Sequence, residues 1–184
     1  YRNLSALGYT EDEIKSIAAN YTVMDGPNDE GEMVERAAKP SDYFKSPFAN
    51  DAAAKYANNG ALPPDLSLIT KARHGGADYV YGILTGYESA PHGKVLANGQ
   101  HWNKYMPGHV IAMAAPLSDG QISYEDGTPQ TVDQYARDVS EFLTWAAEPE
   151  MEERKRMGIK VLLFLAVLAG IMYGVKRKVW SKLH

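Results

Sequence analysis

The sequence predicts a mostly α-helical domain with long loops, followed by one C-terminal transmembrane helix. Several segments before residue 150 place apolar residues at helical spacing behind a residue that can cap a helix. All ten prolines and most of the sixteen glycines lie in the same region, which is typical of irregular loops between helices rather than of a regular sheet. A long uncharged run near the C-terminus completes the pattern.

The uncharged run, VLLFLAVLAGIMYGV at 161–175, is the strongest single signal. With its apolar neighbours it reaches the roughly 20 residues that a membrane-spanning helix needs. Basic residues lie on both sides, which fits a buried core helix poorly. We expect a transmembrane helix over 159–176, a juxtamembrane linker at 151–158 and a basic tail at 177–184.

The charge of the chain is divided between its two parts. Residues 1–150 contain 11 Lys and Arg against 21 Asp and Glu, whereas residues 151–184 contain 8 against 2. The positive-inside rule therefore favours a C-terminus on the cytoplasmic or matrix side, with the acidic domain 1–150 on the other side. An acidic domain repels nucleic acid, so no nucleic-acid partner is expected.

Five helices are expected in the acidic domain, and two of them begin with a capping box. The helix after Asp65 is expected at 66–73 and the one after Asp78 at 79–84, while short strands are expected at 94–96 and 121–124. A domain with such long loops needs an internal scaffold such as a large cofactor. The expected caps are Thr10 with Glu13, Asn50 or Asp51, Asp65, Asp78, and Thr131 with Gln134.

Familiar enzyme motifs are absent from the sequence. The chain contains no cysteine, which excludes disulfides, thiolate metal sites and a CxxCH haem-attachment motif within these residues. Neither HExxH nor GxSxG occurs, and there is no P-loop or dinucleotide-binding fingerprint. The sequence therefore does not predict a zinc hydrolase.

Three segments could contribute to a cofactor site, and each also has an ordinary structural explanation. Met113 offers a thioether that can bind haem iron, although a methionine among alanines more often packs in a core. Pro63 and Pro64 leave backbone carbonyls free to orient a ligating imidazole, or they simply connect two helices. Arg73, at an expected helix end, can pair with a carboxylate such as a haem propionate, or cap the helix.

An acidic segment, DGPNDEGE at 25–32, is the fourth candidate. Such a loop is usually only solvated surface. In a domain that is acidic throughout, it would also steer a basic soluble partner toward a transient encounter that weakens with salt. Its carboxylates are Asp25, Asp29, Glu30 and Glu32.

Taken together, these segments resemble the cytochrome c1 family over essentially the whole chain. The order and number of the matching strings make coincidence very improbable. They are YRNL (1–4), DGPNDEGEM (25–33), NNGALPPDLS (58–67), ARHGGADYV (72–80), LTGY (84–87), PGHVIAMAAPL (107–117), DGTP (126–129) and WAAEPEMEERKRMG (145–158).

The resemblance implies a c-type cytochrome-like helical haem domain that carries haem c. Met113 then corresponds to the axial methionine of the iron, and Pro63 and Pro64 to the loop beside the proximal histidine. Arg73 with Tyr79 corresponds to contacts with a haem propionate, and the region of Asn58 to the wall of the haem pocket. The CxxCH motif and its histidine are expected a few residues before Tyr1.

The resemblance also implies a function: an electron-transfer subunit of the cytochrome bc1 complex, a quinol–cytochrome c reductase. Its haem takes an electron from the Rieske iron–sulfur protein and passes it to a soluble cytochrome c. Segment 25–32 lies on the side that faces this soluble cytochrome. The membrane helix lies beside cytochrome b in a dimeric complex. The domain would lie in the bacterial periplasm or the mitochondrial intermembrane space.

Two alternatives stay open at this point. One is a haem-free, tail-anchored structural subunit of a respiratory membrane complex. The other is a membrane-anchored monohaem cytochrome of a different complex.

Overall fold

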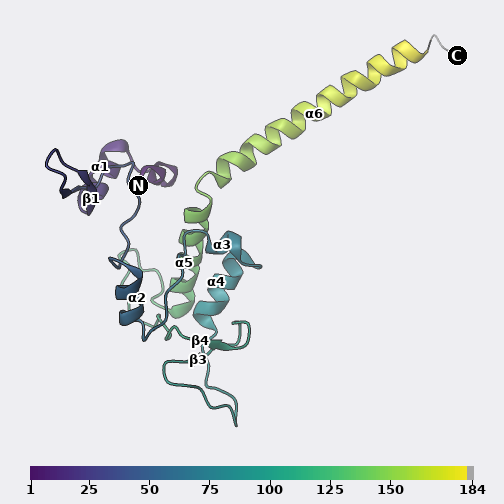
Figure 1. Cartoon of the computed structure of the whole chain (residues 1–184). Helices are drawn as coiled ribbons and strands as arrows, with labels where there is room; N and C mark the ends of the chain where they lie inside the picture. The colour runs from purple at the N-terminus through teal and green to yellow at the C-terminus, as the bar shows by residue number, and fades with distance from the viewer. Residues whose placement is uncertain (182–184) are drawn as a thin grey trace. The chain divides into compact units, whose positions relative to one another are not determined.

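The computed structural model describes residues 1–181 and divides into two compact units, Tyr1–Ala147 and the segment from Glu148 onward (Figure 1). The first unit contains five α-helices, a 3₁₀ helix and two short hairpins, and the second is one long helix. The predicted helical domain with an apolar C-terminal helix is confirmed. The last three residues of the predicted basic tail, 182–184, lie outside the described residues.

The first unit begins with a small helical cluster. The 3₁₀ helix η1 (Arg2–Leu7) precedes α1 (Glu11–Ala19), which starts at the predicted capping box. The Glu13 amide donates to Thr10 Oγ1 at 3.4 Å, and the Thr10 amide donates to Glu13 Oε2 at 2.7 Å. The core of this cluster is small, and its buried residues are Tyr1, Leu4, Ile14, Ala18 and Ala38, with Ile17, Val23 and Trp145 packed against them.

An antiparallel hairpin carries the acidic segment, where only a loop was expected. Strands β1 (Thr22–Pro27) and β2 (Met33–Ala37) pair with an irregularity between Asp25 and Pro27. That irregularity comes where Gly26 and Pro27 break the alternation of side chains, so the strands were hard to predict from pattern alone. A second, minimal hairpin joins β3 (His101–Trp102) to β4 (Val110–Ile111).

Both predicted strand positions were wrong. Residues 94–96 form no strand, and the Lys94 amide closes a turn on the Pro91 carbonyl at 3.1 Å. At 121–124 the backbone of Ile122 bonds a side chain instead of another strand. The hydroxyl of buried Tyr135 donates to the Ile122 carbonyl at 2.6 Å and accepts from its amide at 3.1 Å.

The helix after Asn50 forms as expected, but the next three helices along the chain differ from the prediction in their boundaries or caps. Of the two candidate caps of α2 (Asp51–Ala57), Asn50 and Asp51, the structure uses Asn50, whose Oδ1 accepts the Ala53 amide at 2.9 Å. Asp65 does not cap a helix over 66–73, because its carboxylate accepts the Ser67 amide in a local turn at 2.8 Å. Helix α3 is therefore only Ile69–Ala72.

Helix α4 (Gly76–Thr85) begins two residues before the predicted cap, Asp78, which lies in its first turn. The reason is the glycine pair Gly75–Gly76, whose φ angles of 93° and 54° turn the chain sharply between α3 and α4.

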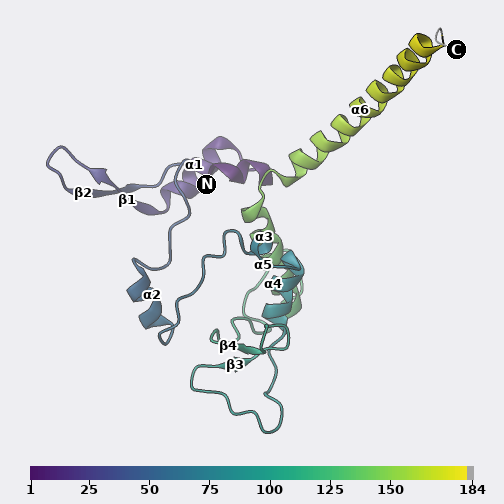
Figure 2. The same ribbon diagram turned by 45° about the vertical axis from the view of Figure 1, so that its right-hand side comes forward.

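Helix α5 (Val132–Ala147) packs against α3 and α4, and the three lie side by side in both views (Figure 2). The Gln134 amide donates to Thr131 Oγ1 at 3.3 Å, but the Gln134 side chain bonds Asp138, so the predicted capping box is only half formed. The buried apolar residues between these helices are Val80, Ile83, Tyr135, Ala136 and Leu143.

The second unit is helix α6 (Met151–Trp180), a continuous helix of 30 residues. Its most apolar window has a mean hydropathy of 2.2, and none of that window is buried within the structure. At 1.5 Å per residue the helix is about 45 Å long, enough to cross a bilayer and extend beyond it. The predicted linker 151–158 is helical, and the point at which α6 enters a membrane stays a prediction.

Candidate cofactor site

Helix α4 forms the platform on which the segment leading to Met113 rests. Two glycines one turn apart, Gly82 and Gly86, expose the backbone of α4 to this segment. A Cβ on Gly86 would lie 2.6 Å from the Tyr105 ring and 2.7 Å from Asn103 Oδ1, and one on Gly82 would lie 3.1 Å from Tyr105. The segment therefore packs directly on the helix, and a larger residue at Gly86 has no room.

Asn103 ties this segment to the end of α4. The residue is completely buried. Its side-chain Nδ2 donates to the Ile83 carbonyl at 2.7 Å, and its Oδ1 accepts the Tyr105 amide at 3.0 Å. Its own amide donates to the His109 carbonyl at 3.0 Å. The Asn103 side chain thus pairs the Ile83 carbonyl at the end of α4, which has no other partner among residues 1–181, and stabilises the turn at residues 103–105.

Met113 follows the β3–β4 hairpin and is held from one side by Tyr87. The Tyr87 hydroxyl donates to the Met113 carbonyl at 3.0 Å. Partial burial raises the pKa of the Tyr87 phenol, which keeps the hydroxyl protonated as a donor. Met113 itself is 42% exposed, so it does not pack in the core of this structure. The residue is therefore partly open to a ligand.

Arg73 and Tyr79 lie at the turn between α3 and α4. Arg73 is the C-cap residue of α3, and its exposed guanidinium makes no ion pair with any residue in 1–181. Tyr79, in the second turn of α4, donates its hydroxyl to Met106 Sδ at 3.8 Å. Tyr79 and Tyr87 thus both reach the segment 103–113, whereas Arg73 has a free charged group that suits a carboxylate.

The predicted residues Asn58, Pro63 and Pro64 lie on a separate segment. Asn58 ends α2, and its side-chain amide donates to the Ala54 carbonyl at 2.7 Å. Residues 61–66 have no regular structure, and neither proline carbonyl accepts a hydrogen bond from the described residues. No hydrogen bond within 1–181 joins Asn58, Pro63 or Pro64 to α4 or to the Met113 segment.

These residues have the chemistry that a haem requires. They provide a soft thioether, an unpaired guanidinium and proline carbonyls that can accept from an imidazole. Large apolar side chains also stay exposed in the segment 62–68, in the loop before α5 and in α5 itself, as expected where a flat apolar group would cover them. These side chains are Leu62, Leu66, Leu68, Ile122, Val139 and Phe142.

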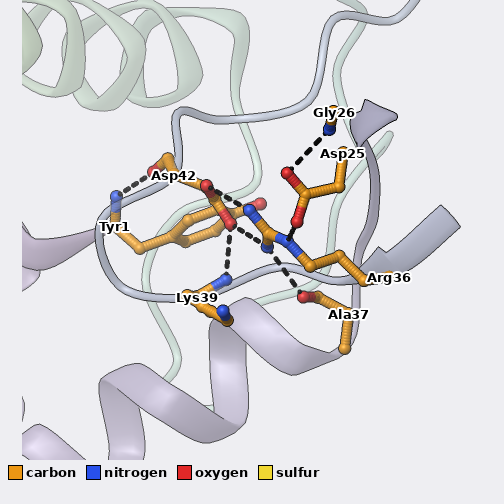
Figure 3. A network of polar contacts seen from close by, with 7 residues as sticks. All are labelled: Tyr1, Asp25, Gly26, Arg36, Ala37, Lys39 and Asp42. Atoms are coloured by element: carbon orange, nitrogen blue, oxygen red, sulfur yellow. Dashed lines mark hydrogen bonds and ion pairs between the residues drawn. The ribbon is translucent and has the colours of Figure 1, made fainter. Parts of the chain in front are cut away.

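The acidic hairpin is braced at its base by Arg36, on β2 (Figure 3). The guanidinium pairs with Asp25 and bonds both carboxylate oxygens of Asp42, at 2.6 and 3.1 Å. These bonds, together with the Lys39 amide, hold the pKa of Asp42 at about 2, and the Arg36 side chain also lowers the pKa of Asp25. Asp25 is thus already paired within the chain.

The tip of the same hairpin is organised by Asn28. Asn28 Oδ1 accepts the amides of Glu30 and Glu32, at 3.0 and 2.9 Å. The acidic tip, which we define as Asp29, Glu30 and Glu32, is exposed, and none of its carboxylates forms an ion pair within residues 1–181. Of the four predicted docking carboxylates, these three are unpaired.

A family model described as "Cytochrome C1 family" matches residues 1–183. The chain belongs to the cytochrome c1 family. It is 55% identical over 185 residues to "Cytochrome c1-2, heme protein, mitochondrial" of Solanum tuberosum, covering 100% of the chain and 70% of that protein. The resemblance inferred from the sequence is confirmed.

Two further relatives extend the comparison to other lineages. "Cytochrome b/c1" of Bradyrhizobium diazoefficiens is 48% identical over 206 residues, covering 100% of the chain and 30% of that protein. "Cytochrome b-c1 complex catalytic subunit, mitochondrial" of Candida albicans is 48% identical over 182 residues, covering 98% of the chain and 63% of that protein. The chain therefore spans only part of the length of these cytochrome c1 relatives.

Sequence reasoning missed four residues that organise this cytochrome c1 domain: Tyr87, Gly86, Asn103 and Arg36. The spacing of Gly82 and Gly86 was the available signal, because residues four apart share one face of a helix. Asn103 and Arg36 had no local signal, since their partners lie 20 and 11 residues away in the sequence.

Proposed function

We propose that this chain is the haem-binding, electron-transferring part of a cytochrome bc1 complex. When bound, haem c supplies one-electron redox chemistry between the Rieske iron–sulfur protein and a soluble cytochrome c. The observation that carries the proposal is that Met113 is exposed on a segment that Asn103 and Tyr105 anchor to α4, in a chain of the cytochrome c1 family.

The residues around the site have distinct roles in this proposal. Met113 would hold the haem iron through its thioether, and a thioether ligand would raise the reduction potential relative to a second nitrogen ligand. Arg73 pairs with a propionate, and Tyr79 lies beside it. The carbonyl of Pro63 or Pro64 orients the proximal histidine, and Asn58 lines the pocket. Covalent attachment and the proximal histidine are expected upstream of Tyr1.

Replacing the ligand tests this assignment directly. Met113→Leu keeps the size and apolarity of the side chain but removes the sulfur. Because axial ligands shift haem potentials over a range of about 0.8 V, we expect a fall on the order of hundreds of millivolts. Redox titration of the purified complex measures it, with Met33→Leu on the hairpin as the control. An unchanged potential in Met113→Leu would contradict the assignment.

The acidic tip supports a second part of the proposal, the docking of a basic soluble cytochrome c. Three unpaired carboxylates on an exposed hairpin add to the negative field of a domain that carries 21 acidic against 11 basic residues over 1–150. Such a field raises the rate of encounter with a cationic partner, and salt screens it. Asp25 contributes less to this field, because Arg36 compensates its charge.

Neutralising the acidic tip tests the docking role. The variant Asp29→Asn, Glu30→Gln, Glu32→Gln is expected to slow the reduction of a basic cytochrome c about tenfold at low salt, and far less at high salt. The matched control, Glu11→Gln, Glu125→Gln, Glu141→Gln, removes the same charge from exposed positions elsewhere. Equal slowing by both triple variants would show that total charge, not the acidic tip, determines the rate.

The membrane arrangement follows from α6. We propose that α6 crosses the bacterial cytoplasmic or mitochondrial inner membrane once beside cytochrome b in a dimeric complex, with its C-terminus inside. Residues 1–184 contain no cysteine, and the two cysteines of the expected CxxCH motif would be bonded to the haem, so introduced cysteines can report the topology. Single cysteines introduced as Ser123→Cys and Ser181→Cys should react with an impermeant reagent from opposite sides of the membrane, and reaction from one side would refute it.

The haem-free structural subunit considered from the sequence is not favoured, since the chain belongs to the cytochrome c1 family and its relative from Solanum tuberosum is a haem protein. A pyridine haemochrome assay on the purified complex distinguishes the two. Co-purification with cytochrome b distinguishes the proposal from a monohaem cytochrome of another complex.

A further inference from the structure

The segment that carries Met113 has very few backbone restraints of its own. Between Ala112 and Leu117 the chain has no regular structure. Within the described residues, the bond from the Tyr87 hydroxyl to the Met113 carbonyl is the only hydrogen bond made by this stretch. The position of the Met113 backbone therefore depends on one phenol, 26 residues earlier in the sequence.

Tyr87 is itself held firmly. It directly follows Gly86, and its backbone pairs with buried Asn103 in an isolated antiparallel bridge. Asn103 in turn bonds the Ile83 carbonyl of α4. The Tyr87 hydroxyl is thus a fixed point on the α4 platform, and it reaches across to a segment that is otherwise free.

We infer that Tyr87 is a positioning residue for the thioether of Met113, and that its hydroxyl limits displacement of this ligand from the haem iron. The inference rests on the proposed function, because it takes Met113 as the axial ligand. A methionine side chain has three rotatable bonds, so the location of its backbone decides how often the sulfur is within reach of a fixed metal. Loosening the backbone lowers the effective concentration of the sulfur at the iron.

Tyr87→Phe isolates the hydrogen bond, because it keeps the partly buried ring. The experiment uses the purified, haem-loaded complex and imidazole as the competing ligand of the ferric iron. Loss of one neutral hydrogen bond corresponds to roughly a 2- to 10-fold change in an equilibrium. We expect Tyr87→Phe to retain the near-infrared absorption band of methionine-ligated ferric haem but to bind imidazole roughly 2- to 10-fold more tightly than the wild type.

A control tyrosine is available on α4, the helix that precedes Tyr87. Tyr81 also donates its hydroxyl to an oxygen, on Asp133 of α5, away from the Met113 segment. Tyr81→Phe loses a similar bond and should bind imidazole as the wild type does. Replacement of Tyr87 by meta-fluorotyrosine keeps the ring and strengthens the donor, so it should weaken imidazole binding even if Tyr87→Phe yields too little folded complex.

The outcomes separate the inference from the proposed function. If the wild type lacks the methionine band, or if Met113→Leu retains it, the proposed function fails and the inference fails with it. If Met113→Leu abolishes the band while Tyr87→Phe and the fluorinated variant both bind imidazole as the wild type does, only the role of Tyr87 is refuted. An equal effect in Tyr81→Phe also refutes it, because the change would then reflect general loosening.

Discussion

Single polar side chains with distant partners organise much of this domain. Asn103 connects a helix end to a turn, and Arg36 connects two carboxylates that lie 17 residues apart in the sequence. In both cases the side chain replaces backbone pairing that a larger sheet or a longer helix would provide. The stability of the loops therefore depends on a few identifiable groups.

Asn103→Ala is expected to destabilise the domain by about 1–3 kcal/mol, because the Ile83 carbonyl and the Tyr105 amide lose their partners in a buried site. Denaturant unfolding followed by fluorescence measures the change. Asn98→Ala, at an exposed position in the preceding loop, is the control and should be nearly neutral. A neutral Asn103→Ala would mean that water replaces the amide at no cost.

The bonds from Arg36 to Asp25 and Asp42 predict that the stability of the hairpin falls at low pH. The pKa of Asp42 falls from 3.8 to about 2 because the ionised carboxylate accepts bonds from Arg36 and the Lys39 amide. A lowered folded-state pKa means that the stabilisation is complete above about pH 4 and is lost as the pH falls toward 2. Hydrogen exchange of the peptide 22–42, corrected for intrinsic rates, should increase over this interval.

Arg36→Met should remove most of that pH dependence and leave the hairpin less protected at pH 7. Arg2→Met removes an exposed arginine that has no ion pair within residues 1–181, and it should behave as the wild type. Retention of the full acid response in Arg36→Met would assign the response to other carboxylates.

At the scale of elements, α4 is the most consequential helix, because the segment 103–113 packs on its glycine face. This contact is possible because Gly82 and Gly86 have no side chains, so Tyr105 can lie directly against the backbone of α4. Helix α4 therefore connects the α3–α5 packing with the site around Met113.

Gly86→Ala is expected to destabilise the domain by about 1–3 kcal/mol through overpacking, since the new methyl group would overlap Tyr105, Asn103 and the Gly82 carbonyl. Gly26→Ala, where a Cβ meets nothing within 4 Å, is the matched control. Thermal unfolding compares the two, and equal melting temperatures would show that the segment 103–113 shifts without strain.

The expected helices and strands show where local pattern is sufficient. The cap at Thr10 was predicted correctly and the cap of α2 was narrowed to Asn50 or Asp51, because a cap and its target amide are three residues apart. Helix starts after Asp65 and Asp78 were predicted wrongly, for two different reasons. The Asp65 carboxylate accepts the amide two residues later and forms a turn, whereas the Gly75–Gly76 pair lets α4 begin before Asp78. The strand predicted at 121–124 does not form for a different reason: the hydroxyl of buried Tyr135 bonds the amide and the carbonyl of Ile122, which a neighbouring strand would otherwise bond.

At the scale of the whole molecule, an acidic domain is followed by a helix with the length and apolarity of a membrane anchor. The two parts have opposite charge, since residues 1–150 are strongly acidic and residues 151–184 are basic. Such a division suits a protein whose domain is held at a membrane surface by its tail.

Val167→Arg places a charge near the middle of the predicted span 159–176. Arginine at the centre of a membrane helix costs about 2.5–3.5 kcal/mol of insertion free energy. We expect a substantially larger fraction of the protein to be extracted by alkaline carbonate, whereas Ser181→Arg, beyond the span, should leave extraction unchanged. Complete retention of Val167→Arg in the membrane would place the centre of the span elsewhere.

Composition and short-range pattern were enough to predict the long apolar C-terminal helix, the cap at Thr10, the acidic character of the domain and the family, because each depends on composition or on residues close together in the chain. Three facts came only from the folded chain: Asp25 is paired, Met113 is exposed, and the Tyr87 hydroxyl bonds the Met113 carbonyl. Those facts depend on which distant segments meet, and packing across 11 to 26 residues leaves no periodic signal in a single sequence.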